Sequence, residues 1–238
     1  MSYFKNFPLS FYSFGDSEES AVVQNIATYV DILDDIKANS AFYQDYYVQG
    51  GERPDQTAFT LYRNPHMHWT FYLMNDKIRE QGWPLEYRGV VEKAKSDYSN
   101  FTITTTGPIH DAFNIGSTIT GGASNATGTI VHKNLNLGQI VVKLSSALEF
   151  HVAEVAICEG DIVTVTGASK EYLAANHYVL NNERVDLDLS NMSVPLGAVP
   201  KTNLDFYVEE NDKLKQIRVI KPSSINTVQA LFNEALRS

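Results

Sequence analysis

Few residues of this 238-residue chain have types and spacings that could do chemistry. His66 and His68 could bind a metal ion from a strand or a bend, but on a helix two residues that far apart point in different directions. Glu52 and Asp55 could serve as the acid and base of a glycosidase. Capping and turn roles at the start of a helix fit this pair better. We therefore predict no catalytic residues and no metal site.

Cys158 is the only cysteine in the sequence, which excludes an intramolecular disulfide and a zinc site built on cysteines. Its neighbour Glu159 is an anion, whereas a nucleophilic thiolate usually needs a nearby cation. We predict a buried structural thiol. The sequence also lacks a phosphate-binding glycine loop, a His-Glu-x-x-His helix and a Gly-x-Ser-x-Gly elbow. No enzyme activity, no cofactor and no small-molecule substrate are expected.

The charge balance narrows the class of partner. Lys and Arg number 19 against 28 Asp and Glu, so the formal net charge is −9. A nucleic-acid partner requires a basic footprint, and this composition argues against one. No stretch approaches the roughly 18 apolar residues of a membrane-spanning helix. The first residues contain no apolar run of signal-peptide length, which favours synthesis in the cytoplasm without export.

The elements that position these residues begin with an aromatic arm and a helix over residues 1–40. Phe4, Phe7, Phe11 and Phe14 lie in the arm, and exposing so many rings is costly, so we expect them to face a partner. Asp16 then provides a helix start. The helix is predicted from apolar residues at steps of three and four, namely Val22, Val23, Ile26, Ala27, Val30, Leu33 and Ile36.

Residues 41–100 have the pattern of a compact module. A short strand at residues 46–48 precedes a Gly-Gly turn, and Asp55 is a plausible cap for the helix that follows. Asn64-Pro65 ends this helix, because the residue before proline avoids the helical region. A second helix carries Trp69, which we expect to be largely buried. Val90-Val91 is predicted to return as the closing strand.

The composition changes near residue 101. Residues 101–180 are rich in Thr, Ile, Val and Gly, and their short glycine-bounded strands predict an inserted small all-β domain, either a barrel or a sandwich. Residues 181–205 have the composition of a linker. The final part of 181–238 is then predicted to form a strand at 215–220 and a helix whose apolar stripe contains Ile225, Val228, Leu231, Phe232 and Leu236.

Two blocks of sequence resemble a known family. The runs 46–55, 61–65 and 69–76 are similar to the baseplate wedge subunit of T4-like phages, the product of gene 53, and 210–226 resembles the C-terminal end of that family. The resemblance covers about residues 17–95 and 200–238. The middle differs, because 101–180 instead resembles a glycine- and threonine-rich β module of phage tail proteins.

This resemblance implies an α+β fold: a LysM-like module with an N-terminal helix, an inserted small all-β domain and a C-terminal strand–helix. It also implies a structural subunit of a contractile phage tail baseplate wedge, which joins neighbouring wedges into a ring around the hub. The implied partners are other baseplate wedge proteins, the sheath-initiating subunit and neighbouring wedges. The implied location is the tail baseplate of the virion, after synthesis in the host cytoplasm.

The aromatic arm and the segment 214–236 carry more apolar surface than a solitary subunit needs. From them we predict partner-binding residues, which are Phe4, Phe7, Phe11, Phe14, Arg218, Leu231 and Phe232. Two other readings remain open. One is a LysM-type peptidoglycan-binding tail or cell-wall adaptor protein, and the other is a tail lysozyme, which needs a pair of carboxylates in a cleft.

Overall fold

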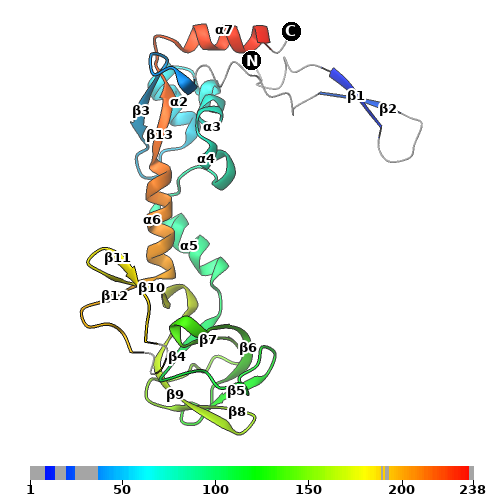
Figure 1. The fold of residues 1–238 in the computed structure, drawn as a ribbon. Coiled ribbons are helices and arrows are strands. Elements are labelled where there is room, and N and C mark those ends of the chain that lie inside the picture. Colours follow the sequence, from blue (N-terminus) through cyan, green and yellow to red (C-terminus); the bar gives the residue numbers. More distant parts are fainter. Residues whose placement is uncertain (1–8, 14–19, 25–36, 189, 191–192, 236–238) are drawn as a thin grey trace. The chain divides into compact units, whose positions relative to one another are not determined.

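The computed structural model describes residues 9–13, 20–24, 37–188, 190 and 193–235 (Figure 1). The chain divides into two compact units, residues 1–86 with 211–238 (unit 1) and residues 87–210 (unit 2). The expected α+β class is confirmed. The finer division into residues 1–40, 41–100, 101–180 and 181–238 stays a prediction.

The chain begins with a hairpin instead of the predicted helix. Strands β1 (Leu9–Ser13) and β2 (Ser20–Gln24) pair antiparallel, with Phe11 opposite Val22. The helix prediction is therefore wrong at residues 20–24. The β-branched pair Val22-Val23 favours a strand, and two adjacent apolar residues fit either a strand or a helix. Residues 14–19 and 25–36 lie outside the described residues, while Lys37 and Ala38 are helical.

Unit 1 is built on an antiparallel pair of strands with helices between them in sequence. The strands are β3 (Tyr43–Tyr47) and β13 (Gln216–Ile220). The helices of the unit are α2 (Pro54–Tyr62), η2 (Pro65–His68), α3 (Trp69–Met74), α4 (Asp76–Gln81) and α7 (Ile225–Ala235). The predicted closing strand at Val90-Val91 is wrong. It lies in helix α5 (Tyr87–Asp97), whose buried residues Val90 and Ala94 are one turn apart.

Helix α2 shows how local sequence sets an element boundary. The cap is Arg53 and not the predicted Asp55. Pro54 takes the first helical position, where its missing N–H costs nothing. The Gln56 side chain accepts a hydrogen bond of 3.0 Å from the Arg53 backbone N–H. Asp55 instead lies in the first turn, where a negative charge interacts favourably with the helix dipole.

The core of unit 1 joins two segments that lie far apart in the sequence. Its buried side chains come from the β3–α4 region and from the C-terminal segment, namely Val48, Ala58, Met67, Phe71, Met74, Ile78, Leu214, Ile217, Val219, Ile220, Ile225 and Val228. Trp69 and Trp83 pack against this cluster and remain partly exposed. The Trp83 indole N–H donates a hydrogen bond of 2.7 Å to the Glu52 carbonyl oxygen, which ties the α4–α5 turn to the loop before α2.

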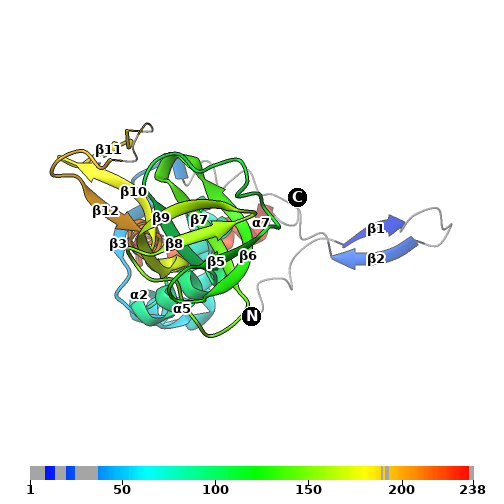
Figure 2. The same cartoon turned by 90° about the horizontal axis from the view of Figure 1, so that it is seen from below.

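Unit 2 contains the predicted all-β domain as a closed six-stranded antiparallel barrel (Figure 2). Its strands follow the order β4-β7-β6-β5-β8-β9 around the barrel, and closure removes both sheet edges. They are β4 (Phe101–Thr105), β5 (Thr118–Gly121), β6 (Thr127–Asn134), β7 (Gln139–Leu144), β8 (Val155–Cys158) and β9 (Asp161–Lys170).

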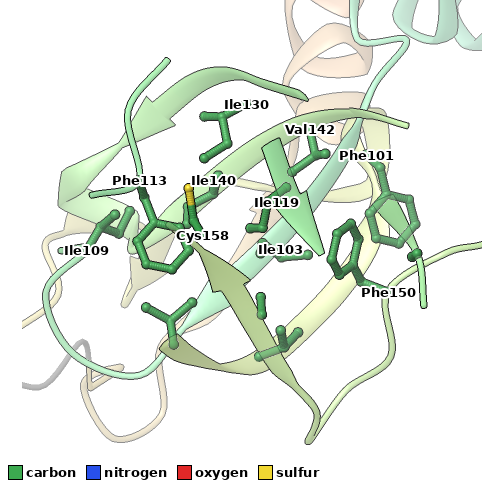
Figure 3. Packing of buried hydrophobic residues seen from close by; sticks show 14 residues of the cluster. Phe101, Ile103, Ile109, Phe113, Ile119, Ile130, Ile140, Val142, Phe150 and Cys158 are labelled. Atoms are coloured by element: carbon green, nitrogen blue, oxygen red, sulfur yellow. The ribbon is translucent and has the colours of Figure 1, made fainter. Parts of the chain in front are cut away.

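The barrel interior is filled by aliphatic and aromatic side chains (Figure 3). Cys158 is among them, 1% exposed, and its thiol donates to the Ala112 carbonyl oxygen at 3.3 Å. Burial raises the pKa of this thiol, and the carboxylate of Glu159 raises it further. The protonated form is therefore favoured, as the predicted structural thiol requires.

A second sheet spans the end of the segment 101–180, which is predicted to be all-β, and the segment 181–205, which is predicted to be a linker. This sheet has the order β11-β10-β12, formed by β10 (Ala175–Leu180), β11 (Glu183–Val185) and β12 (Val199–Thr202). Helix α6 (Asn203–Lys215) follows. Its start carries a Thr-x-x-Asp capping box: the Asp205 carboxylate accepts from the Thr202 N–H at 2.9 Å, and the Thr202 hydroxyl oxygen accepts from the Asp205 N–H at 3.0 Å. This signal could have revealed the helix.

One buried carboxylate organises a turn of the barrel. Glu154 is 6% exposed, and its oxygens accept hydrogen bonds from the backbone N–H groups of Ala123, Ser124 and His151 and from the Ser124 hydroxyl. Burial alone raises the pKa of Glu154, but the hydrogen bonds from Ser124, His151 and Ala123 outweigh it and hold the pKa below its ordinary value of 4.5. Ionised Glu154 therefore stabilises the fold.

We predict that Glu154→Gln lowers the free energy of unfolding by about 2 kcal/mol at neutral pH, because the new NH₂ group faces backbone donors. The stabilisation from the carboxylate is fully present above pH 4.5 and is lost as pH falls through the depressed pKa. The deficit of the variant therefore narrows in acid. Urea unfolding by circular dichroism, with hydrogen exchange at Ala123 and Ser124, measures it. Glu149→Gln, at an exposed ion pair with Lys170, is the control and changes stability by less than about 0.5 kcal/mol.

The two points where unit 2 leaves unit 1 lie close together. The Leu85 N–H donates to the Asn211 side-chain oxygen at 2.7 Å, and the Asn211 side-chain N–H donates to the Leu85 carbonyl oxygen at 3.0 Å.

We predict that a short Gly-Ser linker in place of residues 87–210 leaves unit 1 folded, because the length of a connection changes its closure entropy only slowly. Both tryptophans lie in unit 1, so their fluorescence during urea unfolding reports on it. A chain with no cooperative transition would show that unit 1 requires unit 2.

Candidate interaction surface

The hydrogen bonds of the β3–β13 pair define which backbone groups face outward. The Val48 N–H donates to Lys215 O at 2.9 Å, and the Lys221 N–H donates to Phe42 O at 2.8 Å. In an antiparallel ladder, hydrogen-bonded pairs alternate with non-hydrogen-bonded pairs. Counting along the strands from these two hydrogen-bonded pairs, Asp45–Arg218 is a non-hydrogen-bonded pair. The backbone groups of both residues point away from the partner strand, toward the two edges of the sheet.

The β13 edge is covered by side chains. Asn75 accepts from the Arg218 N–H at 2.8 Å through its oxygen and donates to the Arg218 carbonyl at 2.8 Å through its NH₂ group. The Tyr62 hydroxyl donates to Ile220 O at 2.9 Å. Burial raises the pKa of Tyr62 to about 12, so this donor keeps its proton across the physiological range. Asn75 thus replaces the neighbouring strand that β13 lacks.

In the described part of the chain, the β3 edge has no paired strand, and only its end is covered, where the Gln49 side-chain NH₂ group donates to the Tyr47 carbonyl oxygen at 3.4 Å. Among the described residues, β13 is the only strand that pairs with β3. By the alternation of the ladder, the backbone N–H and C=O groups of Tyr43, Asp45 and Tyr47 face this edge. The Tyr47 side chain is 54% exposed. Next to it on the same face, the Arg218 guanidinium carbon lies 5.0 Å from the centre of the Tyr43 ring. An open strand edge of this kind is a template for pairing with another chain.

The β1–β2 hairpin is the second candidate surface. Phe11 is 78% exposed, Leu9 68%, Tyr12 57% and Val22 56%. Phe11 and Val22 lie directly opposite each other and so share one face, while Tyr12 lies on the other face opposite Ala21. Both faces therefore present apolar side chains. An isolated two-stranded hairpin is at best marginally stable in water, so this one gains most from a covering partner.

The predicted partner-binding residues fall into three groups. Phe11 and Arg218 are exposed, and Leu231 is half-buried on α7. Phe232 is 3% exposed, and its ring centre lies 4.8 Å from that of Trp69, so it contributes to the packing of unit 1. Phe4, Phe7 and Phe14 lie outside the described residues. All seven stay predictions as partner contacts.

The residues considered for catalysis and metal binding have structural roles. The Glu52 carboxylate accepts from the Tyr46 hydroxyl at 3.2 Å and from the Gln49 N–H at 3.3 Å, while Asp55 pairs with Arg53. His68 Nδ1 lies 2.8 Å from the Pro65 carbonyl oxygen within η2. In the described parts of the chain, no three His, Cys, Asp or Glu side chains gather as a metal site. No helix there is long and apolar enough to cross a bilayer.

Sequence comparison decides what kind of protein presents these surfaces. Residues 10–106 match the family model of base plate wedge protein 53. The predicted family resemblance is confirmed. The chain is a non-enzymatic structural component of a phage baseplate wedge, located in the tail of the virion. The matched segment includes most of the hairpin and all of β3, whereas most of the barrel and β13 lie beyond it. No curated protein sequence matches the chain.

Sequence reasoning missed the open edge and its counterpart at β13. The strand at Tyr46–Val48 was expected, but its partner was placed at Val90-Val91, so the edges could not be assigned. No local pattern marks Asn75 as a residue that covers a strand edge. Its contact with Arg218 spans 143 residues of sequence, and no local pattern reveals such a pair.

We predict that Phe232→Ala lowers the free energy of unfolding of unit 1 by about 3 kcal/mol, because it empties a buried aromatic site beside Trp69. Tryptophan fluorescence during urea unfolding measures this change. Phe59→Ala is the matched control: Phe59 is 52% exposed on α2, so its truncation removes little buried surface. Equal losses for the two variants would contradict the assignment of Phe232 to the core.

Proposed function

We propose that the chain joins neighbouring wedges of the baseplate into a closed ring around the hub. The observation that carries the proposal is the β1–β2 hairpin, which exposes apolar side chains on both faces and lies almost entirely in the segment that matches the wedge protein family. Exposed apolar patches of this kind usually mark protein interfaces. Other baseplate wedge proteins, the sheath-initiating subunit and neighbouring wedges are the proposed partners.

We further propose that unit 1 is a LysM-like module interrupted by unit 2. Its order of strand, short helices and strand supports this, with β3 and β13 as the paired outer elements and α2, η2, α3 and α4 between them in sequence. In the sequence, the insertion of unit 2, residues 87–210, then separates the helices from β13. In this proposal the module serves protein contacts.

The same arrangement favours one alternative function, that of a LysM-type peptidoglycan-binding tail or cell-wall adaptor. Co-sedimentation of the purified chain with insoluble peptidoglycan separates the two functions. If the chain joins wedges, it stays in the supernatant. Bovine serum albumin, which also stays in the supernatant, is the control. Saturable sedimentation that free chitin oligomers abolish would favour the wall adaptor.

We predict that a Phe11→Ser, Val22→Ser double variant produces wedges that fail to close into baseplates. The two residues face each other on the hairpin, and their replacement removes apolar contact area without shortening the chain. Electron microscopy of tails from phage carrying the variant measures closure. Leu196→Ser is the control, because Leu196 is 99% exposed in unit 2 and lies outside the matched segment. Normal baseplates from the double variant would overturn the role of the hairpin in joining.

A further inference from the structure

We infer that the β1–β2 hairpin of one copy pairs with the open β3 edge of a second copy, which extends the two-stranded sheet of unit 1 by two strands. The inference rests on the proposed joining function and names the partner of its contact. The partner is another copy of this chain, and the recognition is backbone pairing between strand edges. Such strand addition draws its affinity from main-chain hydrogen bonds and its specificity from alternate side chains.

The first support is the asymmetry of the unit 1 sheet. Its β13 edge is closed by Asn75 and Tyr62, which bind the outward backbone groups of Arg218 and Ile220. The β3 edge lacks a pairing strand in the described part of the chain. Its outward backbone N–H and C=O groups belong to every second residue of the strand, which are Tyr43, Asp45 and Tyr47. Closing one edge leaves a single direction in which the sheet can grow.

The second support is the hairpin itself. Among the described residues, β1 and β2 pair only with each other, so the hairpin also has two edges without a paired strand there. Its described residues are uncharged, in the sequences Leu-Ser-Phe-Tyr-Ser and Ser-Ala-Val-Val-Gln. Two strands are too few for independent stability, whereas a sheet of three or more strands with an apolar face is stable. Adding the hairpin to β3 would give four strands.

The third support is the symmetry that ring closure demands. The hairpin and the β3 edge are different surfaces of the same chain, so a contact between them is head-to-tail. Head-to-tail contacts generate a ring when the rotation closes. A self-complementary contact would instead stop at a pair of copies. A chain that carries both a donor strand pair and an acceptor edge therefore suits a ring of repeating wedges.

The test is photo-crosslinking in assembled tails. The photoreactive residue p-benzoylphenylalanine replaces Phe11, which is 78% exposed on the hairpin. The expected product is a dimer of this chain in which residue 11 of one copy is joined to the segment 38–53 of the other. The same photoreactive residue in place of Tyr87, which is 65% exposed in unit 2, is the control and should give no link to 38–53.

Variants of β3 make the test specific for backbone pairing. Asp45→Pro removes an N–H that faces the open edge and leaves the β3–β13 hydrogen bonds intact, because proline is tolerated on a sheet edge where its nitrogen faces outward. We expect the dimer yield to fall about tenfold with Asp45→Pro and to change less than about twofold with Asp45→Ala, which keeps the N–H. Tryptophan fluorescence verifies that unit 1 is folded. If Asp45→Pro unfolds it, Tyr47→Pro removes the next outward N–H.

Each result has a definite meaning. A dimer linked between residue 11 and 38–53, lost with proline and kept with alanine, supports the inference. A link within one chain overturns it, as does equal yield from the proline and alanine variants. A link from residue 11 to a different baseplate protein also overturns it, but leaves the joining function standing. Failure of the joining function appears separately, as normal baseplates from the Phe11→Ser, Val22→Ser variant.

Discussion

The pairing of β3 with β13 is the interaction on which unit 1 depends. It brings together residues 43–47 and 216–220, so the segments of unit 1 that precede and follow unit 2 in sequence share one sheet and one core. Ile217 and Val219 are buried on the inner side of this pair, and they pack with Phe71 and Met74 from the intervening helices. Without β13, helices α2 and α3 would lose the surface that covers them, because a lone strand cannot bury their apolar faces.

This pairing also joins residues that lie far apart in the sequence. The barrel closes through strands that neighbour each other within residues 101–170, whereas unit 1 must wait for a strand that is synthesised some 170 residues after its partner. Contacts between residues far apart in sequence form slowly, because the entropy of loop closure is lost before these contacts contribute stabilising free energy. The hydrogen bonds between Leu85 and Asn211 shorten that loop, since they bring its two ends together around a folded unit 2.

Local signals in the sequence predicted the elements they encode directly. The Asn64-Pro65 break, the alternation at residues 215–220 and the stripe from Ile225 to Phe232 all correspond to observed boundaries or elements. The glycine-bounded strands after residue 101 correspond to the barrel. Errors arose where two periods fit the same residues, as at Val22-Val23, and where a strand's partner was sought nearby, as at Val90-Val91. The local sequence identifies a strand, but it does not identify the segment of the chain with which that strand pairs.

The short distance between the two ends of unit 2 has a consequence for how such proteins diversify. A segment whose ends lie a hydrogen bond apart can be exchanged in the gene for one of another length or fold, and strands β3 and β13 stay where they are. Such an exchange leaves the β3–β13 pair and the core of unit 1 unchanged. The family match continues through helix α5 and strand β4 and stops at residue 106, so it includes only the first part of unit 2.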